Sequence, residues 1–137
     1  MRGCHLSFPL LCLFIACQQS PDQDAKSQLN LNEETYVMLE VPDDTNMGDL
    51  VKRMRNLNTK SGYPDLRMSS TSVQASDGAQ YFLIVRAFPD LAKAQTYVQL
   101  LLDNHYRTAF AIPETQYKEC MEMMSFDQYK ALYHESK

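Results

Sequence analysis

The sequence predicts a small α+β sandwich in which two crossover helices pack on a four-stranded sheet, with one or two extra helices at the C-terminal end. Residues 33–137 have about the length of one small domain and can bury a single hydrophobic core. Strand-like and helix-like apolar patterns follow one another in the order strand, helix, strand, strand, helix, strand. A last stretch with helical spacing, rich in Tyr and Met, comes after them.

The first half of the domain begins with the apolar run 35–41, which predicts a strand that ends at Pro42. The polar segment 43–46 then supplies the residues that favour a helix start. Apolar side chains recur at helical spacing after it, and the helix ends at the segment 61–64. These apolar positions are Met47, Leu50, Val51, Met54 and Leu57.

A hairpin joins the two halves of the domain. Residues 67–74 are rich in Ser and Thr and predict a polar edge strand, and Ser76-Asp77-Gly78 predicts a hairpin turn after it. Residues 80–88 are apolar on both faces and predict a central strand. A helix opens at Pro89-Asp90 and ends near Asn104, and the run 108–112 predicts a last short strand.

These two strand-helix-strand halves, joined by right-handed crossovers, resemble the split βαβ sandwich of the ferredoxin-like fold. Two short helices should follow it. Residues 114–124 have helical spacing, and Ser125 with Gln128 three residues later has the form of a capping box that opens the last helix.

Residues 1–16 have the pattern of a bacterial signal peptide. The apolar run after Arg2 is too short to span a bilayer and has the length of a signal-peptide core. Its end, Phe14-Ile15-Ala16 followed by Cys17, resembles the lipobox of lipoproteins, which implies cleavage before Cys17 and a diacylglycerol on its thiol. The alternative is an ordinary secretory signal followed by a chance cysteine.

Residues 17–32 are then the lipidated cysteine and a polar, flexible tether. Gln18 rather than Asp follows the cysteine, which resembles outer-membrane sorting in Gram-negative bacteria. We therefore expect a chain anchored in the outer membrane by lipid and facing the periplasm.

The cysteine content and the net charge limit the kinds of site and partner that the domain can have. Removal of the signal takes away Cys4 and Cys12, and lipid occupies Cys17, so only Cys120 remains in the domain. Its helical register with Tyr117 and Met121 predicts a buried, inert thiol. The net charge of −4, without a basic cluster, argues against a nucleic-acid partner.

Chemistry-bearing residues are sparse. His105 and His134 lie at separate helix ends without ligand-spaced partners, and no glycine cluster forms a phosphate loop. Glu119 and Glu122, one helical turn apart, fit an exposed acidic face better than acid-base catalysis. The sequence therefore predicts no enzyme activity, no catalytic residue, no metal, no cofactor and no small-molecule substrate.

Side-chain alternation in the central strand predicts a candidate partner surface. Leu83, Val85 and Ala87 share one face, which the two crossover helices cover. The second face then carries the candidate surface, formed by Tyr36, Met38, Phe82, Ile84 and Arg86. Two alternatives are open: an envelope protein docks there, or the C-terminal helices fold over it through Met121, Met124, Phe126, Tyr129 and Tyr133.

The domain resembles the C-terminal module of the PorW (SprE) lipoproteins. The likeness covers nearly all of residues 35–133 and is carried mostly by apolar and aromatic positions: 50–58, Tyr63, Leu66, 81–85, Phe88, Ala94, Tyr97, 109–112, Tyr117, Tyr129 and Tyr133. Those proteins are outer-membrane lipoproteins of the type IX secretion and gliding machinery of Bacteroidota. The resemblance implies an accessory scaffold without catalytic residues. The chain carries none of the long helical repeats that precede the module in that family.

A second resemblance is to a different class of protein, one that binds glycans. Residues 81–85, Ala87-Phe88, Ala92, Ala94 and Leu100 look like one strand-helix unit of the sporulation-related (SPOR) repeats, although Arg86 stands where that family commonly has a small residue. Those repeats bind peptidoglycan glycan strands through the face of their sheet. Glycan binding is therefore the alternative to a protein-interaction scaffold.

Overall fold

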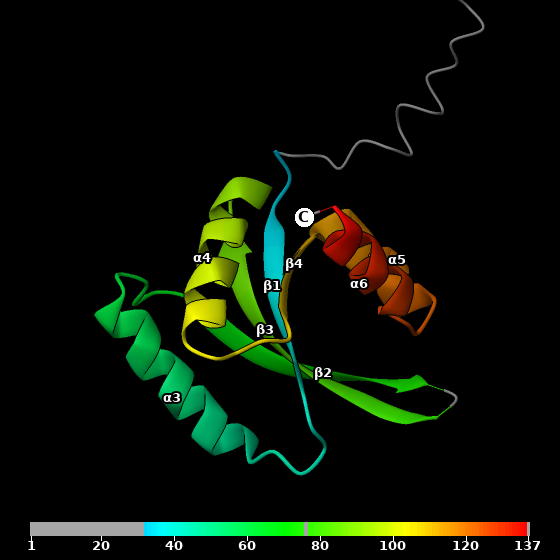
Figure 1. Ribbon diagram of the computed structural model, residues 1–137, viewed down its shortest axis with the longest axis horizontal. Helices are drawn as coiled ribbons and strands as arrows, with labels where there is room; N and C mark the ends of the chain where they lie inside the picture. Colours follow the sequence, from blue (N-terminus) through cyan, green and yellow to red (C-terminus); the bar gives the residue numbers. More distant parts are fainter. Residues whose placement is uncertain (1–31, 76, 137) are drawn as a thin grey trace, which may run out of the picture. The chain divides into compact units, whose positions relative to one another are not determined.

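The computed structural model describes residues 32–75 and 77–136, which hold four strands and four helices. In chain order these are β1 (Thr35–Val41), α3 (Met47–Lys60), β2 (Arg67–Ala75), β3 (Gly78–Phe88), α4 (Leu91–Asp103), β4 (Ala109–Pro113), α5 (Glu114–Glu122) and α6 (Asp127–Glu135) (Figure 1). The fold is α+β and compatible with a ferredoxin-like sandwich that has two extra C-terminal helices, as the sequence predicted.

The sheet has the strand order β2-β3-β1-β4, and all neighbouring strands are antiparallel. β1 and β3 are the central strands, and β2 and β4 form the two edges. The predicted polar edge strand and apolar central strand are therefore both confirmed. β1 is buried along nearly its whole length because its neighbours and helices on both sides enclose it.

Local sequence sets the helix ends. Asn46 caps α3 by accepting a hydrogen bond from the backbone N–H of Asp49, and Asp90 caps α4 in the same way at 2.8 Å from the Lys93 nitrogen. α3 ends at Ser61, and Gly62 follows with a φ of 88°, a conformation that glycine adopts at little cost.

α4 covers the first face of the sheet together with the more peripheral α3 (Figure 1). Leu83 and Val85 are fully buried on this face, as predicted, whereas Ala87 is exposed and the prediction for it is wrong. The pairing of β1 with β3 shifts between Thr35 and Val37, so β3 has one extra residue there. The shift brings Phe88 to the first face, where its ring lies 5.1 Å from that of Tyr97 in α4.

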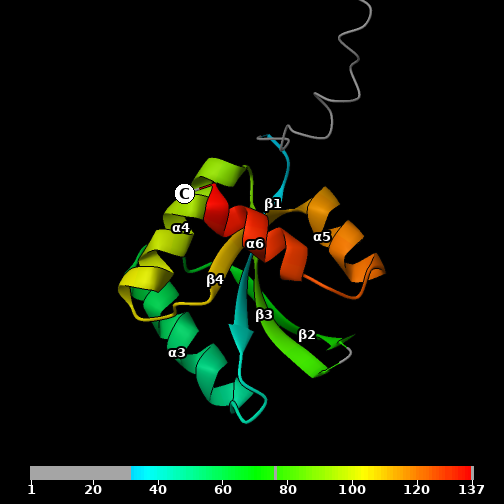
Figure 2. The same ribbon diagram turned by 45° about the vertical axis from the view of Figure 1, so that its right-hand side comes forward.

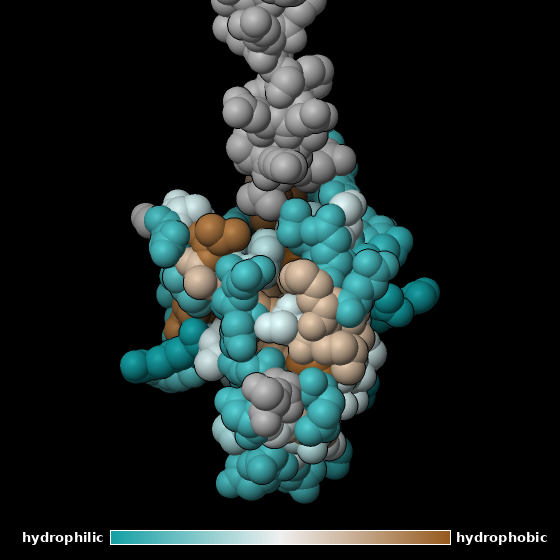
Figure 3. Space-filling model, turned by 90° about the vertical axis from the view of Figure 1, so that its right-hand side faces the viewer, coloured by the Kyte–Doolittle hydropathy of each residue, from teal (hydrophilic) through white to brown (hydrophobic). Residues whose placement is uncertain are grey.

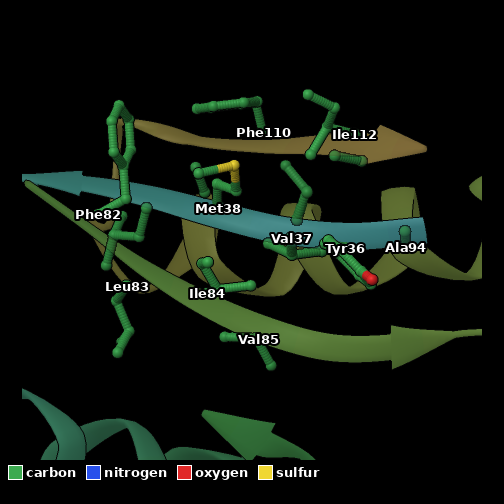
Figure 4. Packing of buried hydrophobic residues seen from close by; sticks show 14 of the residues in the cluster. Tyr36, Val37, Met38, Phe82, Leu83, Ile84, Val85, Ala94, Phe110 and Ile112 are labelled. Atoms are coloured by element: carbon green, nitrogen blue, oxygen red, sulfur yellow. The ribbon is translucent and has the colours of Figure 1, made fainter. Parts of the chain in front are cut away.

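α5 and α6 lie against the other side of the sheet, so the central strands have helices on both faces (Figure 2). Adjacent side chains of β3 point to opposite sides, as Phe82 and Leu83 do in Figure 4, and both are fully buried. None of the helices in the described ranges has the length and apolar character that a membrane span requires.

Candidate functional site

The structure brings the five predicted partner-surface residues together on one face but leaves only one of them exposed. β1 places Tyr36 and Met38 on this face, and β3 places Phe82 and Ile84 beside them, with Met38 directly opposite Ile84. All four side chains are buried, and only Arg86 is exposed. Of the two alternatives, the structure shows the second: the C-terminal helices cover the four apolar residues of this face.

Aromatic packing explains why the face is closed. Phe126, just before α6, is fully buried, and its ring centroid lies 4.9 Å from that of Phe82. Tyr117 of α5 packs edge-on against Tyr36 at 5.1 Å. Tyr129 of α6 packs on Phe110 of β4 at 6.0 Å. These large side chains exclude water from the part of the second face that Tyr36, Met38, Phe82 and Ile84 form.

Polar contacts fix α6 in place. The Tyr129 hydroxyl donates a hydrogen bond of 2.6 Å to the backbone carbonyl of Ala111 in the edge strand β4. The Tyr133 hydroxyl donates to Gln95 Oε1 in α4, which ties α6 to the helix layer of the first face. Lys130 Nζ lies 2.9 Å from Glu40 Oε2 and forms an ion pair with it. Glu40 is the one acidic residue of β1, and it lies on the second face. α6 thus covers β4 as well as the sheet face.

Two predictions for the C-terminal segment need correction. Met124, expected to cover the sheet, is 46 % exposed because it sits in the turn between α5 and α6 with a φ of 56°. Ser125 is not the N-cap of the last helix, since α6 begins after Phe126 without a side-chain cap. Ser125 Oγ instead accepts a hydrogen bond from the Asp127 N–H at 3.3 Å, so its contact with the helix start is local.

The exposed end of the second face carries two arginines. The Arg86 guanidinium lies over the Tyr36 ring, 5.8 Å from its centroid, which is a cation–π contact. Arg67 of β2 stands directly opposite Arg86 across the hairpin and is also exposed. Burial raises the pKa of the neighbouring Tyr117, and Tyr36 adds to the rise, whereas Arg86 and Thr71 oppose it. No ion pair involves either arginine within the described residues.

Exposed large hydrophobic side chains occur mainly on the C-terminal helical segment. Met123 is 58 % exposed in the turn between α5 and α6, next to Met124, and Leu132 of α6 is 65 % exposed. Figure 3 shows this side of the molecule as mostly hydrophilic with smaller hydrophobic areas. Methionine side chains are flexible and polarisable, so an exposed pair of them can adapt to a contacting protein.

Surface hollows lie on the first face and beside it. One of about 430 Å³ lies between the β1–α3 connection and the two hairpin strands, where Asp43, Ser70, Ser72 and Tyr81 are among its lining residues. A second, of about 450 Å³, lies at the start of α4 and includes Lys93 among its lining residues. Among the residues that line them, neither hollow contains a histidine, a cysteine or a pair of carboxylates.

The remaining cysteine and histidine side chains of the domain do not form a site. Cys120 is buried as predicted, and burial, with a smaller effect of Glu119, raises the pKa of its thiol. His105 and His134 are both exposed, in a turn and in α6 respectively. Within residues 32–75 and 77–136 no group of three His, Cys, Asp or Glu side chains has a geometry that holds a metal ion.

Sequence reasoning missed Arg67 as the neighbour of Arg86, although the predicted hairpin turn allows the register to be counted outward from Gly78. It also missed the contacts of Lys130 and Tyr129 with the sheet, for which the sequence contains no local signal. The proposed lipid anchor, Cys17, and the tether lie outside the described residues.

No protein-family model, curated protein or solved structure matches the chain.

Proposed function

We propose that the chain is an outer-membrane lipoprotein, anchored by lipid on Cys17, whose domain is a non-enzymatic protein-interaction module facing the periplasm. The lipobox-like segment 14–17 and the polar tether after it support the anchor. The resemblance to PorW and SprE supports an accessory scaffold role linked to type IX secretion or gliding. Stable anchoring is expected because several acyl chains on one residue bind a bilayer far more strongly than one chain does.

The observation that carries the interaction role is the exposure of large apolar side chains in the α5–α6 turn and on α6, in the same C-terminal segment that closes the sheet. Met123 and Met124 are exposed side by side, and Leu132 is the most exposed large hydrophobic residue described. The C-terminal segment therefore has an inner side that packs on the sheet and an outer side, formed by the α5–α6 turn and α6, that offers apolar contacts. A contact with another envelope protein would bury this outer side.

Cross-linking in intact producing cells, followed by mass spectrometry, tests this proposal. We expect envelope proteins to be recovered with the unaltered chain, and their recovery to fall strongly in the Met123→Ser/Met124→Ser variant. Asn56→Ser, at an exposed position of α3, is the matched control and should keep the same partners. Equal recovery from all three chains would contradict a contact through the α5–α6 turn.

Glycan binding through the sheet face is less well supported. The face opposite α3 and α4 is covered by α5 and α6, with Phe82 and Phe126 fully buried between them. Incubation with purified cell-wall sacculi separates the two functions, because a scaffold should stay in the supernatant. Sedimentation of the chain with the sacculi would favour the glycan-binding alternative.

A further inference from the structure

The outer edge of β2 is open. β2 pairs with β3 without interruption from Arg67 opposite Arg86 to Ala75 opposite Gly78, and no other strand in the described ranges pairs with it. Figure 1 shows this hairpin extending beyond the other two strands. An edge strand presents a row of backbone N–H and C=O groups that can form a ladder with another strand.

The two edges of the sheet differ in their protection. β4 has five residues, ends at Pro113, and has its Ala111 carbonyl bound by the Tyr129 hydroxyl of α6. β2 has nine residues without proline, lysine or a bulge, and its one charged side chain, Arg67, is at its first position. Its middle consists of the small hydroxyl residues 69–72, which let a neighbouring strand approach closely.

The charges along β2 and its turn are self-complementary. Arg67 and Asp77 lie five residues to either side of Ser72, both are exposed, and neither takes part in an ion pair within the described residues. In an antiparallel pair of β2 strands centred on Ser72, Arg67 of each copy comes to the end of the ladder at which the hairpin turn of the other copy carries Asp77. Parallel pairing in register would instead place like charges side by side.

We propose that β2 is a self-association edge through which two copies of this chain pair antiparallel about a twofold axis at Ser72. The two sheets then form one continuous sheet with an Arg67–Asp77 ion pair at each end of the new ladder. The ion pairs also relieve the like-charge contact between Arg67 and Arg86 within each hairpin. This inference rests on the domain alone and does not depend on lipidation or on other envelope proteins.

Disulfide trapping of the full chain in producing cells tests the proposed axis. Directly opposite residues of an antiparallel strand pair have Cα atoms about 4.5–5.5 Å apart, which is within the range that a disulfide spans. We therefore expect Ser72→Cys to give a covalent dimer on a non-reducing gel after mild oxidation. Asn56→Cys, exposed on α3, is the matched control and should give much less dimer, because nothing in the proposed pairing brings the two copies of α3 within disulfide distance. No dimer with Ser72→Cys, or equal dimer with both variants, would overturn the proposal.

Charge reversal in the Ser72→Cys background tests the orientation. Arg67→Glu should lower the trapped dimer about fivefold, an effect of the size expected for two exposed ion pairs turned repulsive. Adding Asp77→Arg should restore it. Within one chain Arg67 and Asp77 lie at opposite ends of β2, roughly 25 Å apart at strand spacing, so only a contact between copies can produce the rescue.

Two readouts complete the charge test. Lys52→Glu, an equal charge change on the exposed surface of α3, should leave trapping unchanged. An unaltered melting temperature in every variant shows that exposed substitutions have not unfolded the domain. A double reversal that fails to restore the dimer would overturn the antiparallel arrangement.

Discussion

Phe126 packs its ring against Phe82, with 4.9 Å between the ring centroids, and both side chains are fully buried. Phe82 belongs to the central strand β3, whereas Phe126 precedes the last helix. Their contact makes α5 and α6 an integral part of the hydrophobic core, because without it one side of β1 and β3 would be in contact with water. The apolar residues on that side stabilise the domain and do not form an open docking face.

Phe126→Ala should destabilise the domain by about 3–5 kcal/mol, since it removes a large buried ring and leaves a cavity beside Phe82. Met124→Ala, two residues earlier and 46 % exposed, is the control and should change the free energy of unfolding by less than about 0.5 kcal/mol. Urea unfolding followed by circular dichroism measures both. Equal stability of the two variants would mean that the C-terminal helices are not part of the core.

Sequence patterns were sufficient for the sheet and its two crossover helices. The apolar run in 80–88 and the helical spacing in 91–102 can be recognised from neighbouring residues alone, and the hairpin turn fixes the β2–β3 register. The position of Ala87 was not predictable in this way, because the extra residue in β3 is needed only for pairing with β1. A bulge of this kind depends on long-range contacts that a single strand does not encode.

The cover over the second face was predictable only as one of two alternatives. Helical spacing identified Tyr129 and Tyr133 as apolar positions of one helix, but it gave no direction for that helix in space. Its direction is set by the hydrogen bonds to Ala111 and Gln95 and by the Lys130–Glu40 ion pair, which join residues far apart in the sequence. Residue type alone does not reveal such pairs.

High pH should destabilise the domain through its buried tyrosines. Burial raises the pKa of Tyr97 and of Tyr129 far above the ordinary value of 10.0. The unfolded chain therefore loses these protons from about pH 10 upward while the folded chain keeps them, so the stability present below pH 10 is lost as the pH rises further. Unfolding experiments at constant salt between pH 8 and pH 11 should show this decline.

Tyr129→Phe provides the comparison for the pH experiment. It should cost about 1 kcal/mol at neutral pH, because the Ala111 carbonyl loses its donor, and it should make the decline above pH 10 shallower. Tyr81→Phe, at a side chain that is 38 % exposed, should leave the decline unchanged. An identical pH profile for Tyr129→Phe and the unaltered chain would contradict this explanation.

The Cys120 thiol should react slowly in the folded chain. It is 3 % exposed and burial raises its pKa, so both access and thiolate content are low. The difference in thiol titration between the chain and its Cys120→Ser variant reports on this residue alone. We expect no difference under native conditions and one additional reactive thiol after denaturant is added. Rapid native labelling would instead indicate an accessible, reactive cysteine.

The lipid anchor on Cys17 is the central claim of the proposed function, and metabolic labelling with radioactive palmitate tests it most directly. The unaltered chain and Cys120→Ala should both carry label and partition into the detergent phase. Cys17→Ala should carry none and should leave the membrane fraction, because no other thiol is placed to receive diacylglycerol. Undiminished labelling of Cys17→Ala would contradict the claim that this protein is a lipoprotein anchored at that residue.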